Sequence, residues 1–141
     1  MTAGPRTLQQ KRAAHALSIV HEVSDDFASH YRSYVESLPA TIVMNGLGQA
    51  CATLMARSRD NSPRARAYDL LYKHLQDWLC RSEAAVYPQA ESLIDAIVKN
   101  DQEKYVHAQA EALAYLDWLK KFAQAFLKAA PADSGGSNYV K

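Results

Sequence analysis

The chain has little of what supports covalent stabilisation, secretion or membrane insertion. Its 141 residues include two cysteines, Cys51 and Cys80, which are too few for a disulfide scaffold and lack CxxC spacing or an activating neighbour. The N-terminus, Met1 to Gln10, has no apolar run of the kind found in signal peptides. No apolar stretch approaches the roughly 20 residues that span a bilayer. We therefore expect a cytoplasmic protein with no membrane partner.

Glycine, proline and net charge are also scarce. Five glycines and five prolines, among many Ala, Leu, Gln, Glu, Lys and Arg residues, favour an all-helical protein. The net charge of +1 means that any nucleic-acid contact must come from a local basic cluster. The length fits one domain. We predict a compact all-α bundle of about five or six helices over residues 1–131, with a long C-terminal helix and a disordered tail over 132–141.

Helix boundaries follow from capping residues and breakers. Thr7 and Gln10 have the spacing of a capping box. Pro39 predicts a break or kink, and Ser62-Pro63 and Pro88 predict helix starts. The predicted helices therefore run from Thr7 to an interruption at Ser24–Asp26, on to about Ser37, then Ala40–Met44, Leu47–Arg57, one from Pro63, a short one from Pro88, and Asp101–Ala129.

The residues that catalysis needs are not arranged for it. None of the five histidines follows a glutamate by three residues, as the ligands of di-iron bundles do. His107 and Glu111 have the i, i+4 spacing of an ordinary surface pair. Gly46-Leu-Gly48 lacks the lysine and the preceding strand of a phosphate-binding loop. We interpret the chain as non-enzymatic, with no metal and no cofactor.

The candidate binding residues are basic. Four arginines fall within ten residues around a predicted helix start, where free backbone amides add affinity for anions, and the guanidinium fork suits phosphate. The alternative is a solvated loop whose charges serve solubility. The candidates for RNA binding are Arg57, Arg59, Arg64 and Arg66, with Lys73 further along the same helix and Lys11 and Arg12 as a weaker second patch.

Two features suggest packing rather than chemistry. Tyr115 and Phe122 lie on the apolar stripe of the last helix, together with Tyr105, Leu119 and Phe126, so core packing is favoured over base stacking. Trp118 lies off that stripe, and we expect it at a boundary between helices or at a protein interface. Gly48, Ala52 and Ala56 form a smooth stripe for close helix approach, within the chain or between molecules.

Two segments carry a resemblance to a known family. Residues 38–50 resemble a signature "LP…I..NGLGQ", and residues 111–123 resemble "EAL.YL.WLK.FA". Both are found, in this order, in the small all-helical subunit of the type III-B CRISPR effector, the Cmr complex, and the resemblance covers about residues 7–129. The matching positions include Leu38, Pro39, Asn45, Gly46, Leu47, Gly48, Gln49, Glu111, Trp118, Leu119, Lys120 and Phe122. The segment after Gln49, Cys51-Ala-Thr-Leu, departs from the usual pattern.

The resemblance implies a function without catalysis. Such subunits stack in several copies along an antiviral ribonucleoprotein, beside the other Cmr subunits, and help to hold the duplex of CRISPR RNA and target RNA by its backbone. Basic contact residues are not part of the two motifs, so the arginines and lysines above remain predictions from charge patterning. The alternative is a helical adaptor or self-associating scaffold without an RNA role, with Trp118 or the small-residue stripe at its interface.

Overall fold

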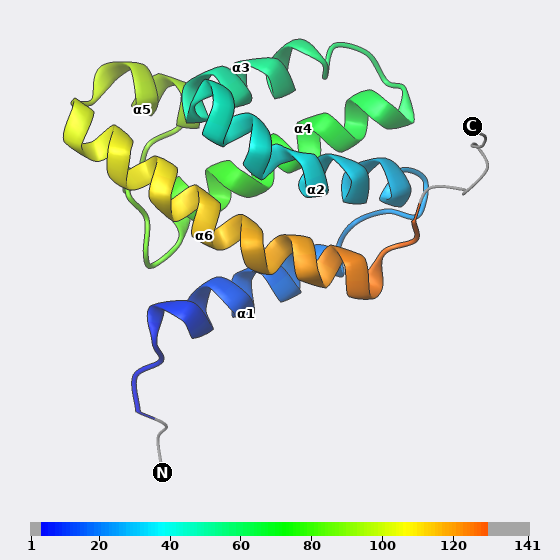
Figure 1. The fold of residues 1–141 in the computed structure, drawn as a ribbon, viewed down its shortest axis with the longest axis horizontal. Helices are drawn as coiled ribbons and strands as arrows, with labels where there is room; N and C mark the ends of the chain where they lie inside the picture. Colours follow the sequence, from blue (N-terminus) through cyan, green and yellow to red (C-terminus); the bar gives the residue numbers. More distant parts are fainter. Residues whose placement is uncertain (1–3, 130–141) are drawn as a thin grey trace.

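The computed structural model describes residues 4–129, which form helices and connecting loops and no strand. Figure 1 shows how the helices are arranged. The elements are α1 (Leu8–Val20), α2 (Ala28–Asn45), α3 (Leu47–Ala56), α4 (Pro63–Gln76), the π-helical turn η1 (Asp77–Arg81), α5 (Leu93–Lys99) and α6 (Gln102–Phe126). The predicted all-α class and the long last helix are confirmed.

The long helix α6 organises the bundle. It packs against α1 on one side and α2 on the other, while α2 also packs on α4 and α3 bridges α4 and α5 (Figure 1). The apolar faces of these helices meet in one core, whose largest fully buried side chains are Trp78, Tyr31 and Tyr115. Within residues 4–129, no helix combines the length and the apolar character needed to cross a membrane.

Three predicted helix starts are confirmed by their capping bonds. Thr7 and Gln10 form the reciprocal capping box, with the Gln10 amide donating to the Thr7 hydroxyl and the Thr7 amide to the Gln10 side chain. Ser62 accepts from the Ala65 amide, with Pro63 as the first helical residue. Asp101 accepts from the Lys104 amide at the start of α6.

The predicted break at Pro39 is wrong. Helix α2 continues through Pro39 to Asn45 and includes Ala40–Met44, the segment predicted as a separate short helix. An internal proline costs a helix about 3 kcal/mol. Leu38 and Ile42, on either side of Pro39, are 4% and 0% exposed, so their burial in the core offsets that cost.

The short helix predicted from Pro88 is present as α5, but its predicted start is wrong, and so is the predicted end of the last helix. Residues 82–92 form a loop, and α5 begins only at Leu93, whose amide donates to the side chain of Gln76. Buried Val86 and Tyr87 hold this loop on the core, so its packing prevails over the helix-starting tendency of proline. Helix α6 ends at Phe126 and not at Ala129. The prediction of Phe126 as a core residue is also wrong, because this residue is 54% exposed. The predicted tail, 132–141, lies outside the described residues.

Candidate nucleic-acid interface

A polar hollow lies between the end of α3 and the start of α4. Helix α3 ends at Ala56, the chain turns, and α4 begins at Pro63, so the arginines at 57, 59 and 64 meet around one opening. Its lining residues are Ala56, Arg57, Arg59, Asp60, Ser62, Arg64, Ala65 and Tyr68. The fold thus brings together three of the four arginines predicted for RNA binding.

The acidic residue in this lining faces the backbone. The Ser62 amide donates to Asp60 Oδ1 at 2.8 Å, and hydrogen bonding from Ser62 lowers the pKa of the carboxyl. Asp60 therefore stays ionised but is engaged in shaping the loop. Within residues 4–129, neither Arg59 nor Arg64 forms an ion pair, so their charges face the hollow and the solvent.

Tyr68 lines one side of the site, and Tyr34 stacks on it. Arg57 Nη1 donates to the Tyr68 hydroxyl at 3.3 Å, and its guanidinium carbon lies 5.7 Å from the centre of that ring. The ring of Tyr34, from α2, stacks on Tyr68 with centroids 3.8 Å apart and planes 7° from parallel. Contact with Tyr34 also raises the pKa of Arg64. Neither tyrosine was singled out from the sequence, because the two lie 34 positions apart.

The remaining predicted residues on α4 lie outside the hollow. Arg66 is two positions beyond Arg64 and so faces another side of the helix, where it lies 3.9 Å from Asp26 and stacks over Phe27 at 5.0 Å. Lys73 pairs with Asp69 at 2.8 Å, one turn earlier on α4. Both side chains remain substantially exposed.

The two basic residues of α1 face other partners. Lys11 lies 3.5 Å from Glu83. The side chain of Arg12 is 15% exposed, and two of its nitrogens donate to the two oxygens of Glu111 at 2.7 Å each. The guanidinium of Arg12 is therefore already engaged by a buried carboxylate, unlike those in the hollow.

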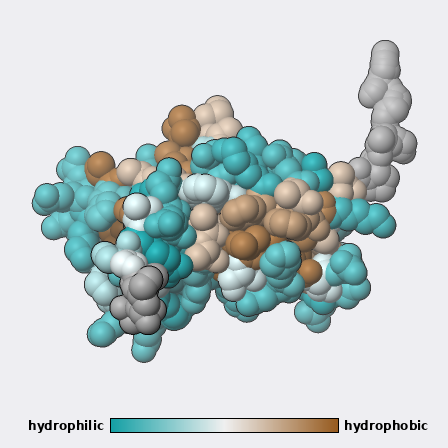
Figure 2. Space-filling model, turned by 90° about the horizontal axis from the view of Figure 1, so that it is seen from below, coloured by the Kyte–Doolittle hydropathy of each residue, from teal (hydrophilic) through white to brown (hydrophobic). Residues whose placement is uncertain are grey.

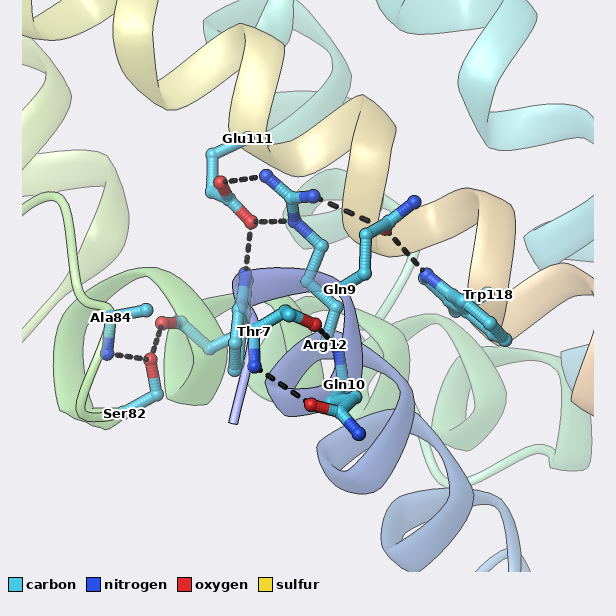
Figure 3. A network of polar contacts seen from close by, with 9 residues as sticks. Thr7, Gln9, Gln10, Arg12, Ser82, Ala84, Glu111 and Trp118 are labelled. Atoms are coloured by element: carbon cyan, nitrogen blue, oxygen red, sulfur yellow. Dashed lines mark hydrogen bonds and ion pairs between the residues drawn. The ribbon is translucent and has the colours of Figure 1, made fainter. Parts of the chain in front are cut away.

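Glu111 is the centre of a network that joins three elements (Figure 3). Besides Arg12 of α1, it accepts from the indole of Trp78 in η1 at 2.9 Å, and the residue is 5% exposed. Burial raises the pKa of Glu111, but hydrogen bonds from Arg12 and Trp78 outweigh it, and the pKa lies below its usual value. Trp118 donates to Gln9 at 2.9 Å, so this candidate interface residue ties α6 to α1 within the chain.

The other motif also makes contacts inside the molecule. Gly46 has φ of +90° and ψ of 157°, a conformation essentially restricted to glycine, and it turns the chain from α2 into α3. The amides of Leu47 and Gly48 donate to Gln109 and to the Tyr105 hydroxyl on α6, each at 2.9 Å. The motif thus joins the α2–α3 turn to α6.

The small-residue stripe is divided between core and surface. A Cβ on Gly48 would lie 3.5 Å from Ile97 of α5, so this glycine serves a contact within the chain. Ala52 and Ala56 are exposed. Of the other motif residues, Leu38, Leu47 and Leu119 are buried, Pro39, Lys120 and Phe122 are half-buried, and Asn45 and Gln49 are exposed.

The sequence does not predict the contacts of two histidines, His15 in a part-buried position and His74 in a buried one. His15 lies 2.7 Å from Asp77 and 2.6 Å from the Tyr115 hydroxyl, and His74 lies 2.6 Å from the hydroxyl of Tyr31. Burial lowers the pKa of His74 to about 4, so it is neutral at pH 7. The available signal was the position of His74 between Leu71 and Leu75 on the buried face of α4. Across residues 4–129, no three His, Cys, Asp or Glu side chains are placed to hold a metal ion.

Apolar surface gathers on a different face. Figure 2 looks at the molecule from below and shows apolar surface in the middle of that face. Helix α1 lies on this side in Figure 1, next to the C-terminal half of α6. The two helices carry the exposed side chains Leu17 and Phe126, and Phe126 packs beside His21 with ring centroids 4.9 Å apart.

These features define a small all-helical bundle with a buried polar network and an arginine-lined surface hollow. Comparisons with known proteins identify its family. The family model described as "CRISPR-associated protein (Cas_Cmr5)" matches residues 8–126, so the chain belongs to the Cmr5 family. It is accordingly a small subunit of the type III-B effector, the Cmr complex.

A solved structure supports the same assignment. The crystal structure of a CRISPR-associated Cmr5 family protein from Thermus thermophilus is similar, with a TM-score of 0.68 and 28% sequence identity. The match covers 87% of this chain and 100% of that chain. The family resemblance predicted from the two motifs is therefore confirmed.

Proposed function

We propose that this chain is a non-catalytic structural subunit of the Cmr complex in the cytoplasm, which stacks in several copies and contacts the backbone of the CRISPR RNA–target RNA duplex. The contact surface is the hollow of Arg57, Arg59 and Arg64. The observation that carries this proposal is that three arginines line one opening, while the carboxylate of Asp60 accepts from a backbone amide.

The chemistry of the hollow suits a phosphate backbone. Guanidinium groups bind phosphate oxygens through two parallel hydrogen bonds and keep their charge at any physiological pH. Contacts to the backbone carry no base information. A subunit that must accept any guide sequence requires this property. Because about three phosphate contacts release few counterions, one subunit alone binds weakly. Repetition along an assembly raises the effective concentration for each further contact.

The other predicted basic residues rank below the hollow. Arg66, Lys73 and Lys11 are held by exposed ion pairs, which contribute about 0–1 kcal/mol each and can be exchanged for phosphate. Arg12 is the least suited, because a phosphate would have to displace the buried Glu111 carboxylate.

The alternative is a helical adaptor or self-associating scaffold with no RNA role. One observation favours it, namely the exposed apolar residues Leu17 and Phe126 on the face of α1 and α6. Trp118 and Gly48, which were the sequence candidates for such an interface, contact other helices of the same chain. This function predicts assembly with partner subunits that does not depend on RNA or on the arginines.

Binding to RNA as a function of salt separates the two functions. We expect the slope of log affinity against log salt concentration to be roughly −2 to −4 per subunit, measured alone and with partner subunits. Changing Arg57, Arg59 and Arg64 together to Glu should abolish this binding while the melting temperature stays that of the wild type.

Two outcomes would contradict the proposal at different levels. Unchanged RNA binding by the triple variant would overturn the choice of surface. An absence of RNA binding by the chain in any assembly would overturn the RNA-binding function and leave the adaptor.

A further inference from the structure

In the hollow, contacts with neighbouring side chains hold Arg57 in place. Resting on the RNA-binding function proposed above, we propose that the hollow is a preordered site for phosphodiester groups of the RNA backbone, and that Tyr68 is a positioning residue that holds Arg57 ready for them. Tyr68 acts through the arginine and does not touch the RNA. Tyr34 stacks on the ring of Tyr68 and so supports it.

Tyr68 joins the core of the bundle to the surface hollow. Tyr68 is 9% exposed and lies in the core cluster with Leu71 and Leu75 on the buried face of α4. Its hydroxyl nevertheless reaches the hollow and accepts from Arg57 at 3.3 Å. The guanidinium also lies over the ring, so one tyrosine holds Arg57 through its edge and through its face.

Helix α2 supports Tyr68 through Tyr34. The parallel stack with Tyr34 fixes the plane of the Tyr68 ring from a helix whose neighbouring residues, Val35 and Leu38, are buried. A free arginine loses rotamer freedom when it binds, and each such side chain weakens binding by about two- to tenfold. An arginine already oriented by Tyr68 avoids most of that loss.

Ionisation of Tyr68 changes the charge in the hollow. The groups facing the Tyr68 hydroxyl are Tyr34 of α2, Arg57 after α3, and Arg64 of α4, with Arg59 and Asp60 in the loop between them. Burial raises the pKa of Tyr68, but contacts with Tyr34 and Arg57 and the charges of Arg57 and Arg64 bring it below the usual value. Burial raises the pKa of Tyr34. As the pH rises, Tyr68 therefore ionises before Tyr34 and places a negative charge beside the bound phosphate.

The test replaces one hydroxyl group. Tyr68→Phe keeps the ring, its stack with Tyr34 and its face under Arg57, but removes the acceptor. The matched control is Tyr72→Phe, one turn along α4, whose hydroxyl accepts from the Ile94 amide at 3.1 Å and lies outside the lining of the hollow. The probe is single-stranded 2′-O-methyl RNA at low salt, which survives alkaline pH.

We expect Tyr68→Phe to weaken RNA binding by about two- to tenfold at pH 7.5, and Tyr72→Phe to leave it unchanged. Between pH 7.5 and 10 the wild type should lose affinity progressively, whereas Tyr68→Phe should lose less, since its hollow gains no phenolate. A role of Tyr68 in folding alone would not produce this difference in the pH profiles. Wild-type affinity together with a wild-type pH profile in Tyr68→Phe would overturn the positioning role.

Two further arms separate this proposal from the function on which it rests. If Arg59→Gln weakens binding and Tyr68→Phe does not, the positioning role fails and RNA binding by the hollow stands. If neither variant, nor Arg57→Gln with Arg64→Gln, affects binding, the proposed contact surface itself fails. The same RNA with a 5′-phosphate should bind as well as with a 5′-hydroxyl, and a clear preference for the 5′-phosphate would overturn the diester assignment in favour of a terminal phosphate.

Discussion

The interior network around Glu111 and the hollow around Arg57 use the same chemistry for different ends. In the interior, the Arg12 guanidinium meets a carboxylate that is 5% exposed and shared with Trp78. In the hollow, three arginines line one opening, and the carboxylate in its lining accepts from a backbone amide. Removing the partner of an arginine paired in the interior leaves an uncompensated charge in the fold, whereas surface arginines without an ion pair are available to a ligand.

The residues that identify the family differ from those that we propose to bind RNA. The motifs that identify the family, around Gly46 and around Glu111, make contacts between helices of this chain. The hollow lies in the α3–α4 loop, outside both motifs. Substitutions that disrupt one region and leave the other intact therefore test this difference.

Glu111→Ala should have the largest effect on stability. It leaves the guanidinium of Arg12 and the indole of Trp78 without their acceptor, and breaking a buried pair in this way costs about 3–5 kcal/mol. Urea unfolding followed by circular dichroism measures this loss. RNA affinity of the folded fraction should be unchanged. A loss below about 1 kcal/mol would show that the network is not a principal support of the fold.

The pH dependence of stability tests the other buried polar contact. The folded-state pKa of His74 is about 4, below the value of about 6.5 for an unfolded histidine, so folding favours the neutral ring. The stabilisation is complete above about pH 6.5 and is lost as the pH falls toward 4, by up to about 3 kcal/mol. Urea unfolding between pH 7 and 4 measures it. His74→Gln should flatten this dependence, and an equally steep profile in the variant would assign it to other groups.

A pair of glycine substitutions gives the smallest and most local contrast. Gly46→Ala should cost about 1–3 kcal/mol, because the backbone there is essentially restricted to glycine and the new Cβ would lie 2.9 Å from the Tyr105 hydroxyl. Gly48→Ala, two residues on, meets atoms no closer than 3.5 Å in a helix and should change stability by at most about 1 kcal/mol. Thermal unfolding compares the two, and equal losses would contradict the role given to Gly46.

Much of the fold could be predicted from local signals. Thr7, Ser62 and Asp101 were recognisable helix starts because a cap acts within three or four residues of its position. Pro39 and Pro88 misled the prediction because their outcome depends on burial of Leu38, Ile42 and Tyr87, which is decided by distant parts of the chain. Tertiary packing prevailed over local preference in both places.

The candidate site was predictable in part for the same reason. Arg57, Arg59 and Arg64 could be grouped because they are close in sequence and flank one helix start. Arg66 could not be separated from them, and the ion pair of Arg12 could not be foreseen, because the partners Asp26 and Glu111 lie 40 and 99 positions away. Charge patterning finds clusters along the chain, and only the packed helices decide which charges are already neutralised.

The salt dependence of RNA binding tests the central claim most directly. The triple variant with Gln at Arg57, Arg59 and Arg64 is compared with the wild type and with Lys99→Gln on α5, which removes one charge at the other end of the bundle (Figure 1). The account predicts a slope of log affinity against log salt that is shallower by about 2 in the triple variant and unchanged in the control, with the same melting temperature. A wild-type slope in the triple variant would contradict it.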